Sequence, residues 1–269
     1  MIVATDSSMK KKSSVAASEW LMSRYALAIL VHAALIAFWY LVVRYGKIPP
    51  FILPGPIETI STLNGSNYHW INNALVTATE IFAGYILAIT IGVGLATVLS
   101  WSNIATLVVM PLLVTLNMVP KVALGPLFIV WLSYGILSNA VIAFSISFFP
   151  ILLNASRGFH EVEPDLLDLV RTLRSSKWQT FTKIKLPSAL PFIFSGMKIG
   201  AILAVAGAIV GEFLGSSRGL GYLMLQVQST LDTAAMFMAV ILITLIGVML
   251  YAIVLGIERW VIVRDARLE

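Results

Sequence analysis

The chain is dominated by long apolar segments that short polar ones separate. Residues 25–43 form 19 residues without a formal charge, flanked by Arg24 and Arg44. A helix of this length is ~28 Å long, close to the thickness of the hydrocarbon layer of a bilayer. Five further apolar segments follow, at about 79–99, 104–119, 137–155, 190–213 and 234–257. Since a helix satisfies its own backbone in lipid, the pattern predicts an all-α membrane protein with six spans.

One apolar segment, residues 120–136, is too short for a full crossing. Gly125 and Pro126 interrupt it, which leaves an apolar core of about a dozen residues. We expect a re-entrant or interfacial segment here. A seventh span would also place the most basic loop, residues 156–189, outside, against the positive-inside rule.

Composition and charge agree with a membrane protein. Hydrophobic residues make up 59% of the chain and charged residues 12%, with a mean hydropathy of +0.92, whereas soluble domains carry roughly 25% charged residues. With six spans and the N-terminus inside, the inside holds thirteen lysines and arginines: four in the N-terminal tail, six in 156–189 and three at the C-terminus. Four lie outside.

This bias in lysine and arginine predicts the orientation of each part of the chain. It predicts a cytosolic tail (1–24), a transmembrane domain (25–260) with a cytosolic loop (156–189), and a cytosolic C-terminal tail (261–269). The basic excess implies contact with the lipid bilayer and no nucleic acid.

Two spans carry small residues at helical spacing. They are Gly84, Ala88, Gly92 and Ala96 in one span, and Gly196, Gly200, Ala204 and Ala208, with Gly207, Gly211 and Gly215, in the other. Small side chains let helix backbones approach closely in a membrane. We expect packing inside the bundle, with a subunit interface or a pore lining as the alternative.

The loop 156–189 is far longer than a connection between neighbouring helices needs to be. Its sequence PDLLDLVRTLR begins with proline and an acid, which favours a helix N-terminus, and its apolar positions share one face: Leu166, Leu169, Val170 and Leu173. Ser176 is a candidate N-cap for a second helix, KWQTFTKIKL, which we expect Pro187 to end. Two short helices at right angles to the spans would form a docking knob for a soluble partner; the alternative is a helix pair lying on lipid headgroups.

The stretch DLVRTLRSSKWQTFTKIKLPSALP resembles the cytoplasmic EAA loop of binding-protein-dependent ABC importer permeases. The pattern of that family is Glu-Ala-Ala, three residues, Gly, nine residues and Ile-x-Leu-Pro. Ile184, Leu186 and Pro187 match its end, and Asp168 stands at the position of the acid. The resemblance implies that this loop inserts into a groove of an ATPase subunit.

The loop also departs from that pattern. Leu169 and Val170 replace the two alanines, and Arg174 replaces the glycine. Glycine permits a tight turn between two helices, so Arg174 predicts an ordinary backbone or a continuous helix, with docking kept in an altered geometry. The ATPase-coupling residues that the resemblance implies are Asp168, Leu169, Arg171, Leu173, Arg174, Trp178, Ile184, Leu186 and Pro187.

Three further stretches resemble the permease branch that imports nitrate, sulfonates, taurine and bicarbonate. They are FILPGPIETI (51–60), the run 123–159, and GEFLGSSRGLGYL (211–223). The resemblance implies a type I ABC importer permease in the bacterial inner membrane, moving a small solute such as an anion by alternating access. The implied partners are a second copy of this chain, two copies of an ABC ATPase that binds ATP and Mg, and an extracytoplasmic solute-binding protein. The family leads us to expect a basic residue where Glu80 stands.

Several kinds of chemistry have no motif in this chain. No G-x-x-x-x-G-K-[ST] occurs, so we expect ATP to be bound and hydrolysed by a partner and not by this chain. The three histidines lack metal-ligand spacing, and there is no cysteine, so we expect no metal, no bound cofactor and no catalytic role.

Ionisable residues within spans are functional candidates. We expect Lys198 to reach the cytosolic interface, and Glu80 and Glu212, near the outer ends of their spans, to be solvated. Lys121 and Asn117 are expected to line the outer gate and attract an anion. The candidate substrate pathway is therefore Asn117, Lys121, Lys198 and Glu212.

Two other functional classes remain as alternatives. One is a secondary transporter or channel subunit that works without an ATPase, a class that usually carries mid-membrane charges and inverted repeats. The other is a membrane-embedded enzyme, which the missing histidine and acid pairs disfavour. Purification of the tagged chain distinguishes them, since only an importer permease retains an ATPase.

Overall fold

A computed structural model of the chain describes residues 26–262, and every regular element among them is a helix. The predicted tail 1–24, and all but the first two residues of the predicted tail 261–269, lie outside the described residues. In chain order the elements are a helix Ala26–Gly46, α2 Pro56–Ser61, η1 Thr62–Asn64, η2 Ser66–Tyr68, α3 Trp70–Leu99, α4 Asn103–Asn117, η3 Lys121–Leu124, α5 Gly125–Leu132, α6 Ile136–His160, α7 Pro164–Thr172, α8 Lys177–Thr180, the π-helical η4 Phe181–Lys185, α9 Leu186–Gly215, α10 Leu220–Ser229 and α11 Thr233–Val261.

Five of the six predicted spans match single helices of the described chain, and the predicted span 104–119 is matched only together with the segment after it. Five are helices long and apolar enough to cross a bilayer: Ala26–Gly46, Ser66–Leu99, Ile136–His160, Lys177–Gly215 and Thr233–Val261. The sixth is a broken pair, Ile104–Asn117 and Lys121–Leu132, bent by 77°. The prediction that residues 120–136 make no straight crossing is confirmed, since α5 has 8 residues and spans only ~12 Å.

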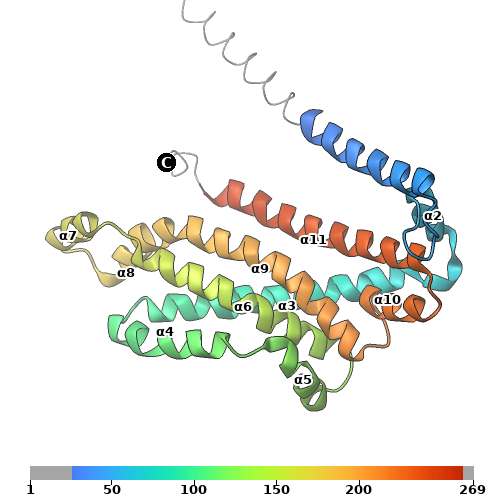
Figure 1. Ribbon diagram of the computed structural model, residues 1–269. Helices are drawn as coiled ribbons and strands as arrows, with labels where there is room; N and C mark the ends of the chain where they lie inside the picture. The colour runs from blue at the N-terminus through green and yellow to red at the C-terminus, as the bar shows by residue number, and fades with distance from the viewer. Residues whose placement is uncertain (1–25, 263–269) are drawn as a thin grey trace, which may run out of the picture.

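The core of the bundle is α6, which packs between α3 and α9 (Figure 1). Contact is close because small residues line the facing surfaces. A β-carbon on Gly207 of α9 would lie 2.7 Å from the Cα of Ala143 in α6, and one on Gly196 would lie 3.0 Å from the carbonyl oxygen of Pro150. The small-residue ladders therefore serve packing inside this chain, as predicted.

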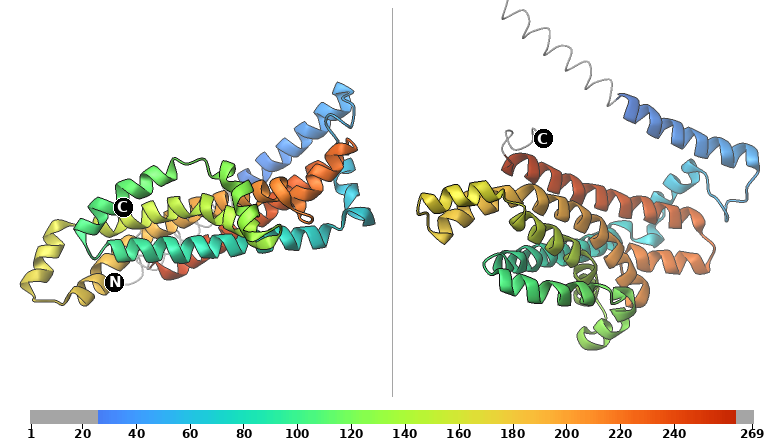
Figure 2. Two further views of the ribbon diagram at one scale, coloured as in Figure 1. Left: turned by 90° about the horizontal axis from the view of Figure 1, so that it is seen from below. Right: turned by 60° about the vertical axis from the view of Figure 1, so that its left-hand side comes forward.

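The first helix, Ala26–Gly46, lies apart from this core. Figures 1 and 2 show it angled away from the bundle, and none of its most apolar stretch is buried within the chain. It is attached near its C-terminal end, where the Trp39 indole donates to the carbonyl oxygen of Pro54 at 3.0 Å and stacks on Phe237 with ring centroids 5.8 Å apart. Its remaining surface is left for lipid or another subunit.

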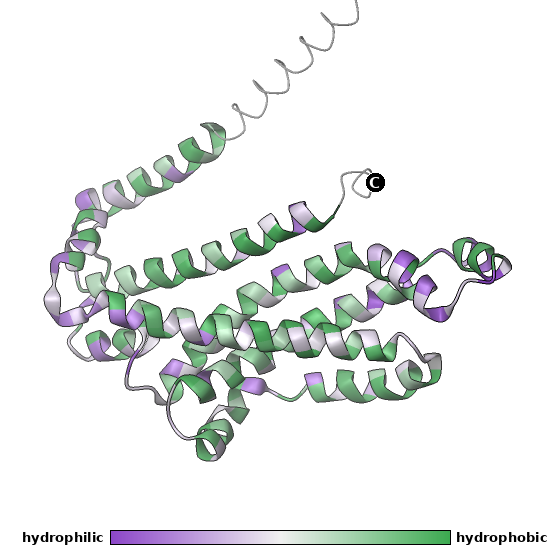
Figure 3. Cartoon of the chain, turned by 180° about the vertical axis from the view of Figure 1, so that it is seen from behind, coloured by the Kyte–Doolittle hydropathy of each residue, from purple (hydrophilic) through white to green (hydrophobic). Residues whose placement is uncertain are grey.

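Polar residues gather at the two ends of the bundle (Figure 3). At one end α7 and α8 project beyond the spans; α2, α5 and α10 lie toward the other (Figure 1). We call these the loop end and the opposite end. The apolar surface between them is what a bilayer covers.

Candidate functional site

The projecting loop, residues 161–185, begins with the amphipathic helix α7. Pro164 is its first residue and Asp165 lies in its first turn, as the sequence predicts. The predicted apolar face is divided in two. Val170 is the buried residue of α7, at 8% exposure, whereas Leu166, Leu169 and Leu173 are 36%, 56% and 72% exposed. Spaced at i, i+3 and i+7, these three leucines form an apolar surface that we call the leucine stripe.

A tight turn ends α7, and Arg174 forms it. The Arg174 N–H donates to the carbonyl oxygen of Arg171 at 3.0 Å, and the Ser175 N–H donates to that of Val170 at 3.2 Å. This is the Schellman arrangement, in which the residue after the C-cap is left-handed. Arg174 has φ +54°. The expectation of an ordinary backbone or a continuous helix was therefore wrong, because these two hydrogen bonds require the left-handed turn even without glycine.

Helix α8 starts where the sequence predicts. The Ser176 hydroxyl accepts from the N–H of Gln179 at 3.2 Å, and the Gln179 side chain accepts from the N–H of Ser176 at 2.9 Å. This reciprocal pair is a capping box. It sets the N-terminus of α8 directly after the turn at Arg174.

The prediction that Pro187 ends this second helix was wrong. Helix α8 passes through the π-helical turn η4 into α9, so that Lys177–Gly215 forms one run, and Pro187 lies within the first two positions of α9. Proline is tolerated in a first turn, where its missing N–H is not needed, and a π-turn shifts the hydrogen-bond register just before it. Ile184 and Leu186 are half-buried in this run. Of the two helices predicted for the loop, only α7 is thus separate from the run that leads into α9.

Aromatic contacts join this run to the neighbouring turn between α3 and α4. The Trp101 ring lies 6.0 Å from that of Trp178 and 5.6 Å from that of Phe181, measured between centroids. The Lys185 ammonium donates to the carbonyl oxygen of Ser100 at 3.3 Å. These contacts hold the helix run into α9 against the α3–α4 turn.

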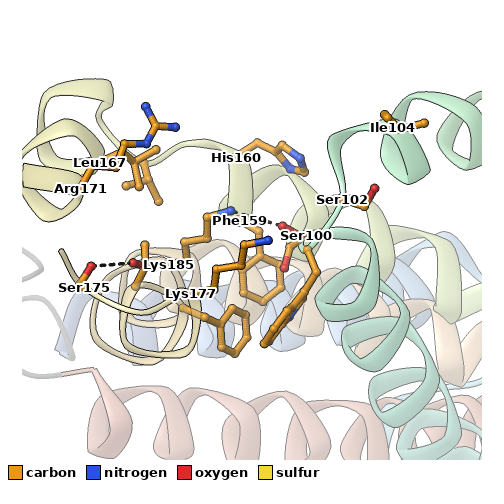
Figure 4. Close-up of a pocket in the computed structure, with 14 residues that line it drawn as sticks. Ser100, Ser102, Ile104, Phe159, His160, Leu167, Arg171, Ser175, Lys177 and Lys185 are labelled. Atoms are coloured by element: carbon orange, nitrogen blue, oxygen red, sulfur yellow. Dashed lines mark hydrogen bonds between the residues drawn. The ribbon is translucent and has the colours of Figure 1, made fainter.

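A cavity of about 820 Å³ lies beneath the projecting loop. Figure 4 shows Leu167 and Arg171 on one side of it and Ser102 and Ile104 across from them. Its basic lining residues are His160, Arg171, Lys177 and Lys185. The exposed pair of Arg171 and Asp168, at 2.8 Å, adds little rigidity in water. The cavity thus lies between α7, which contributes Leu167 and Arg171, and the α3–α4 turn, which contributes Ser102.

Two of the predicted pathway residues lie together at the break between α4 and η3. The Lys121 ammonium donates to the main-chain oxygen of Asn117 and to its Oδ1, the latter at 2.6 Å. The same ammonium lies 4.8 Å from the centroid of the Phe149 ring in α6. The predicted grouping of Asn117 with Lys121 is thus a direct contact, which places a half-buried cation at the bend.

The other intramembrane charges lie in contacts that the sequence did not indicate. Lys198 pairs with Glu258, near the C-terminal end of α11, at 3.0 Å, with side-chain exposures of 26% and 17%; its reach to the cytosolic interface stays a prediction. Glu80 and Glu212 are 0% and 1% exposed; the expectation that water solvates them was wrong, because α3, α6, α9 and α10 close around them. Glu212 therefore faces packed protein and no open space.

Sequence reasoning missed three residues that complete these contacts. Glu258 pairs with Lys198, Asn139 of α6 donates to Glu80 at 2.9 Å, and Trp101 contacts Trp178. A signal existed for Asn139 and Glu258, since polar residues within apolar segments have partners there. Trp101 carried none, because its contact is non-local.

Comparison with known proteins identifies relatives over most of the chain. The family model described as binding-protein-dependent transport system inner membrane component matches residues 81–263. A probable ABC transporter permease protein of Haemophilus influenzae is 33% identical, covering 83% of this chain and 91% of the relative. The formylaminopyrimidine transport permease protein ThiX of Halalkalibacterium halodurans is 31% identical, covering 78% and 84%. A putative aliphatic sulfonates transport permease protein, SsuC, of Bacillus subtilis is 28% identical, covering 86% and 84%.

A solved structure shares the fold. It is a chain of the MetNI methionine ABC transporter in an inward-facing conformation, with a TM-score of 0.58 and 20% identity, covering 72% of this chain and 100% of that one.

Proposed function

Because this chain belongs to the family of binding-protein-dependent transport system inner membrane components, which are ABC transporter permeases, we propose that it forms the translocation pathway of an importer driven by a separate ATPase. In this proposal two copies of the chain form the pathway, and two ATPase subunits bind ATP and Mg and hydrolyse the ATP. A solute-binding protein delivers substrate on the opposite side of the membrane. The chain itself is non-catalytic.

The observation that carries the proposal is the leucine stripe. Leu166, Leu169 and Leu173 are exposed on α7, a helix that projects beyond the spans (Figure 1). In this proposal the stripe faces the cytosol until a partner covers it. An amphipathic helix that lays such a face into a groove of a partner is a common recognition mode. The loop end is then the cytosolic end.

The connection behind the stripe supports transmission of force. The turn at Arg174 is closed by two hydrogen bonds, and the run from α8 to α9 is unbroken. Displacement of α7 by closing ATPases would turn the start of α9, and with it the α3–α4 turn through Trp101 and Lys185. Since α9 packs directly on α6, the pathway helices would rock as a body, as alternating access requires.

The substrate we propose is a small solute, and an anion such as nitrate or a sulfonate fits best. Lys121 places a positive charge at the bend between α4 and η3, next to the amide of Asn117, and an ammonium with a neighbouring amide binds an oxyanion by charge-assisted hydrogen bonds. The relatives named for sulfonates and formylaminopyrimidine also handle small solutes by name.

Co-purification tests the proposal. The tagged chain, expressed with the genes beside its own, is expected to retain an ATPase. Leu169→Glu with Leu173→Glu is expected to lose it, because two charges would be buried in the groove. Asp165→Asn, an exposed change on the same helix, is the matched control and should retain it. A stable oligomer of the wild-type chain without any ATPase would instead support a channel or secondary transporter.

A further inference from the structure

Two carboxyl groups meet inside the bundle, away from the projecting loop. Glu80 lies in α3 and Glu212 in α9, and both are buried, at 0% and 1% exposure. Thr77, one turn before Glu80 on α3, bonds to Glu212, and Asn139, which bonds to Glu80, lies against Gly211, the neighbour of Glu212 in α9. The two carboxyl groups are therefore close neighbours. Two ionised carboxylates can only accept hydrogen bonds, so they cannot bond to each other, and their negative charges repel. A proton or another cation must therefore be bound between them.

The surroundings of Glu212 suit a carboxylate. Its Oε1 accepts from the Thr77 hydroxyl at 2.5 Å, and its Oε2 accepts from the N–H groups of Gly221 at 2.5 Å and Tyr222 at 3.2 Å. These two N–H groups belong to the first turn of α10, whose dipole also favours a negative charge. Thr77 is itself oriented, because its oxygen accepts from the N–H of Leu220 at 2.8 Å. Glu212 is therefore the ionised member of the pair.

The surroundings of Glu80 differ. Its Oε1 accepts one hydrogen bond, from the Asn139 amide at 2.9 Å, while its Oε2 has no partner. The Oδ1 atom of Asn139, whose side chain is also 0% exposed, has none either. Leaving a buried polar atom without a partner is energetically unfavourable. A hydrogen on Glu80 Oε2 converts that atom from an unpartnered acceptor into a donor toward Glu212.

A proton fits this site better than a metal ion does. Calcium and magnesium require about six or more oxygen ligands. Both oxygens of Glu212 are already engaged by three donors, which leaves Glu80 Oε2 and Asn139 Oδ1 as the unengaged oxygens of the cluster. A proton needs only the two oxygens that share it.

No other charge competes for this role among the described groups around Glu80. Its neighbours on α3 and α6, Thr77 and Asn139, are neutral. On α10 the Tyr222 hydroxyl is bonded to Gln226 at 2.7 Å, and Arg218, in the turn before α10, is exposed. Glu212 is the charged group that acts on Glu80.

We propose that Glu80 and Glu212 form an intramembrane proton-binding site, in which neutral Glu80 donates its hydrogen to the Glu212 carboxylate. The proton holds α3, α9 and the start of α10 together. A conformational change that separates these helices would admit water, ionise Glu80 and release the proton. The packing seen here is thus favoured by protonation, and changes that open this part of the bundle are coupled to proton loss. Intramembrane carboxyls serve such proton relays in other transporters.

Infrared spectroscopy of the full chain with its partner subunits, reconstituted in lipid, tests the proposal directly. The wild-type protein is expected to show the C=O stretch of a protonated carboxylic acid at neutral pH, and carbon-13 labelling of glutamate should shift it. Glu80→Gln should remove the band, because the amide takes over the donor role. Glu58→Gln, which changes an exposed glutamate of α2, should leave the band unchanged.

Thermal unfolding as a function of pH gives the second readout. The folded wild type holds one proton more than the unfolded chain, so its unfolding temperature should fall as the pH rises into the alkaline range. Glu80→Gln and Glu80→Lys should lack this dependence, since an amide donor or a fixed ammonium replaces the proton. If either variant fails to fold, the labelled wild-type band still decides. Absence of the band, or its loss on adding sodium or calcium salts at constant pH, would overturn the proposal.

Discussion

Gly84 of α3 faces Ala140 of α6 so closely that a β-carbon on residue 84 would lie 2.5 Å from the carbonyl oxygen of Ala140. The same added atom would lie 2.7 Å from the β-carbon of Ala143. Both distances are below van der Waals contact, and one of the atoms is rigid backbone. The close approach of α3 and α6 therefore depends on this glycine.

Replacing Gly84 by alanine should consequently destabilise the protein. We expect a loss of about 1–3 kcal/mol, the usual cost of overpacking a tight core, measured by thermal unfolding in detergent. Gly94 of the same helix is the matched control, since nothing lies within 4 Å of its added β-carbon. Gly94→Ala should be neutral or slightly stabilising through helix propensity. Equal effects at the two positions would show that α3 and α6 are not packed this closely.

Arg174→Gly should strengthen the turn after α7. The left-handed backbone costs a non-glycine residue about 1–2 kcal/mol. Glycine removes this cost, but its greater freedom in the unfolded chain lowers the gain in the free energy of unfolding. The net gain should be roughly 0.5–1 kcal/mol, seen as slower hydrogen exchange of the amides at 174 and 175. Arg174→Val should speed the same exchange. Unchanged exchange in both variants would contradict the φ of +54° at this residue.

The Lys198–Glu258 pair should show strong coupling in a double-mutant cycle. Lys198→Met leaves the Glu258 carboxylate largely buried without its cation, which should cost about 3 kcal/mol of stability. Glu258→Gln in the same chain should restore most of the loss. The pair links α9 to α11, so chemical unfolding of the four proteins in detergent measures the coupling. Additive losses would mean that the two side chains do not interact.

The ring contact of Trp101 with Trp178 should also be measurable. Trp101→Ala, Trp178→Ala and the double variant should give a coupling energy of about 0.5–1.5 kcal/mol, as aromatic pairs do. If the contact transmits force, each single variant should also reduce transport per ATP hydrolysed in the reconstituted importer. Trp131, exposed on α5, is the control position, and its alanine variant should show neither coupling to Trp178 nor a change in that ratio.

Lys121→Ala should weaken uptake of an anionic substrate. Loss of one charge-assisted hydrogen bond is worth about 1.5–3 kcal/mol, which corresponds to a rise of roughly tenfold or more in the concentration needed for half-maximal uptake. Lys121→Arg keeps the charge and should retain most of the affinity. The measurement is uptake of radiolabelled solute by cells or proteoliposomes. Unchanged uptake in Lys121→Ala would remove this residue from the pathway.

Much of the architecture followed from local pattern alone. Apolar length predicts the spans, because an unpaired backbone is too costly in lipid for anything but a helix. Gly125 and Pro126 marked the segment that the structure bends, and Ser176 marked a helix start, because a cap is a contact between residues three apart. The two small-residue ladders, which contain Gly84 and Gly200, likewise predicted close helix packing.

What only the tertiary structure decided are the contacts between residues distant in the chain. Whether Glu80 and Glu212 face water or one another depends on how α3, α9 and α10 are placed, and hydropathy along one segment carries no information about its neighbours. The pairing of Lys198 with Glu258 likewise depends on how α9 and α11 are placed. At Arg174 and Pro187 local propensity predicted the wrong backbone, because the hydrogen bonds closing α7 and the π-turn before α9 outweigh the preference of a single residue.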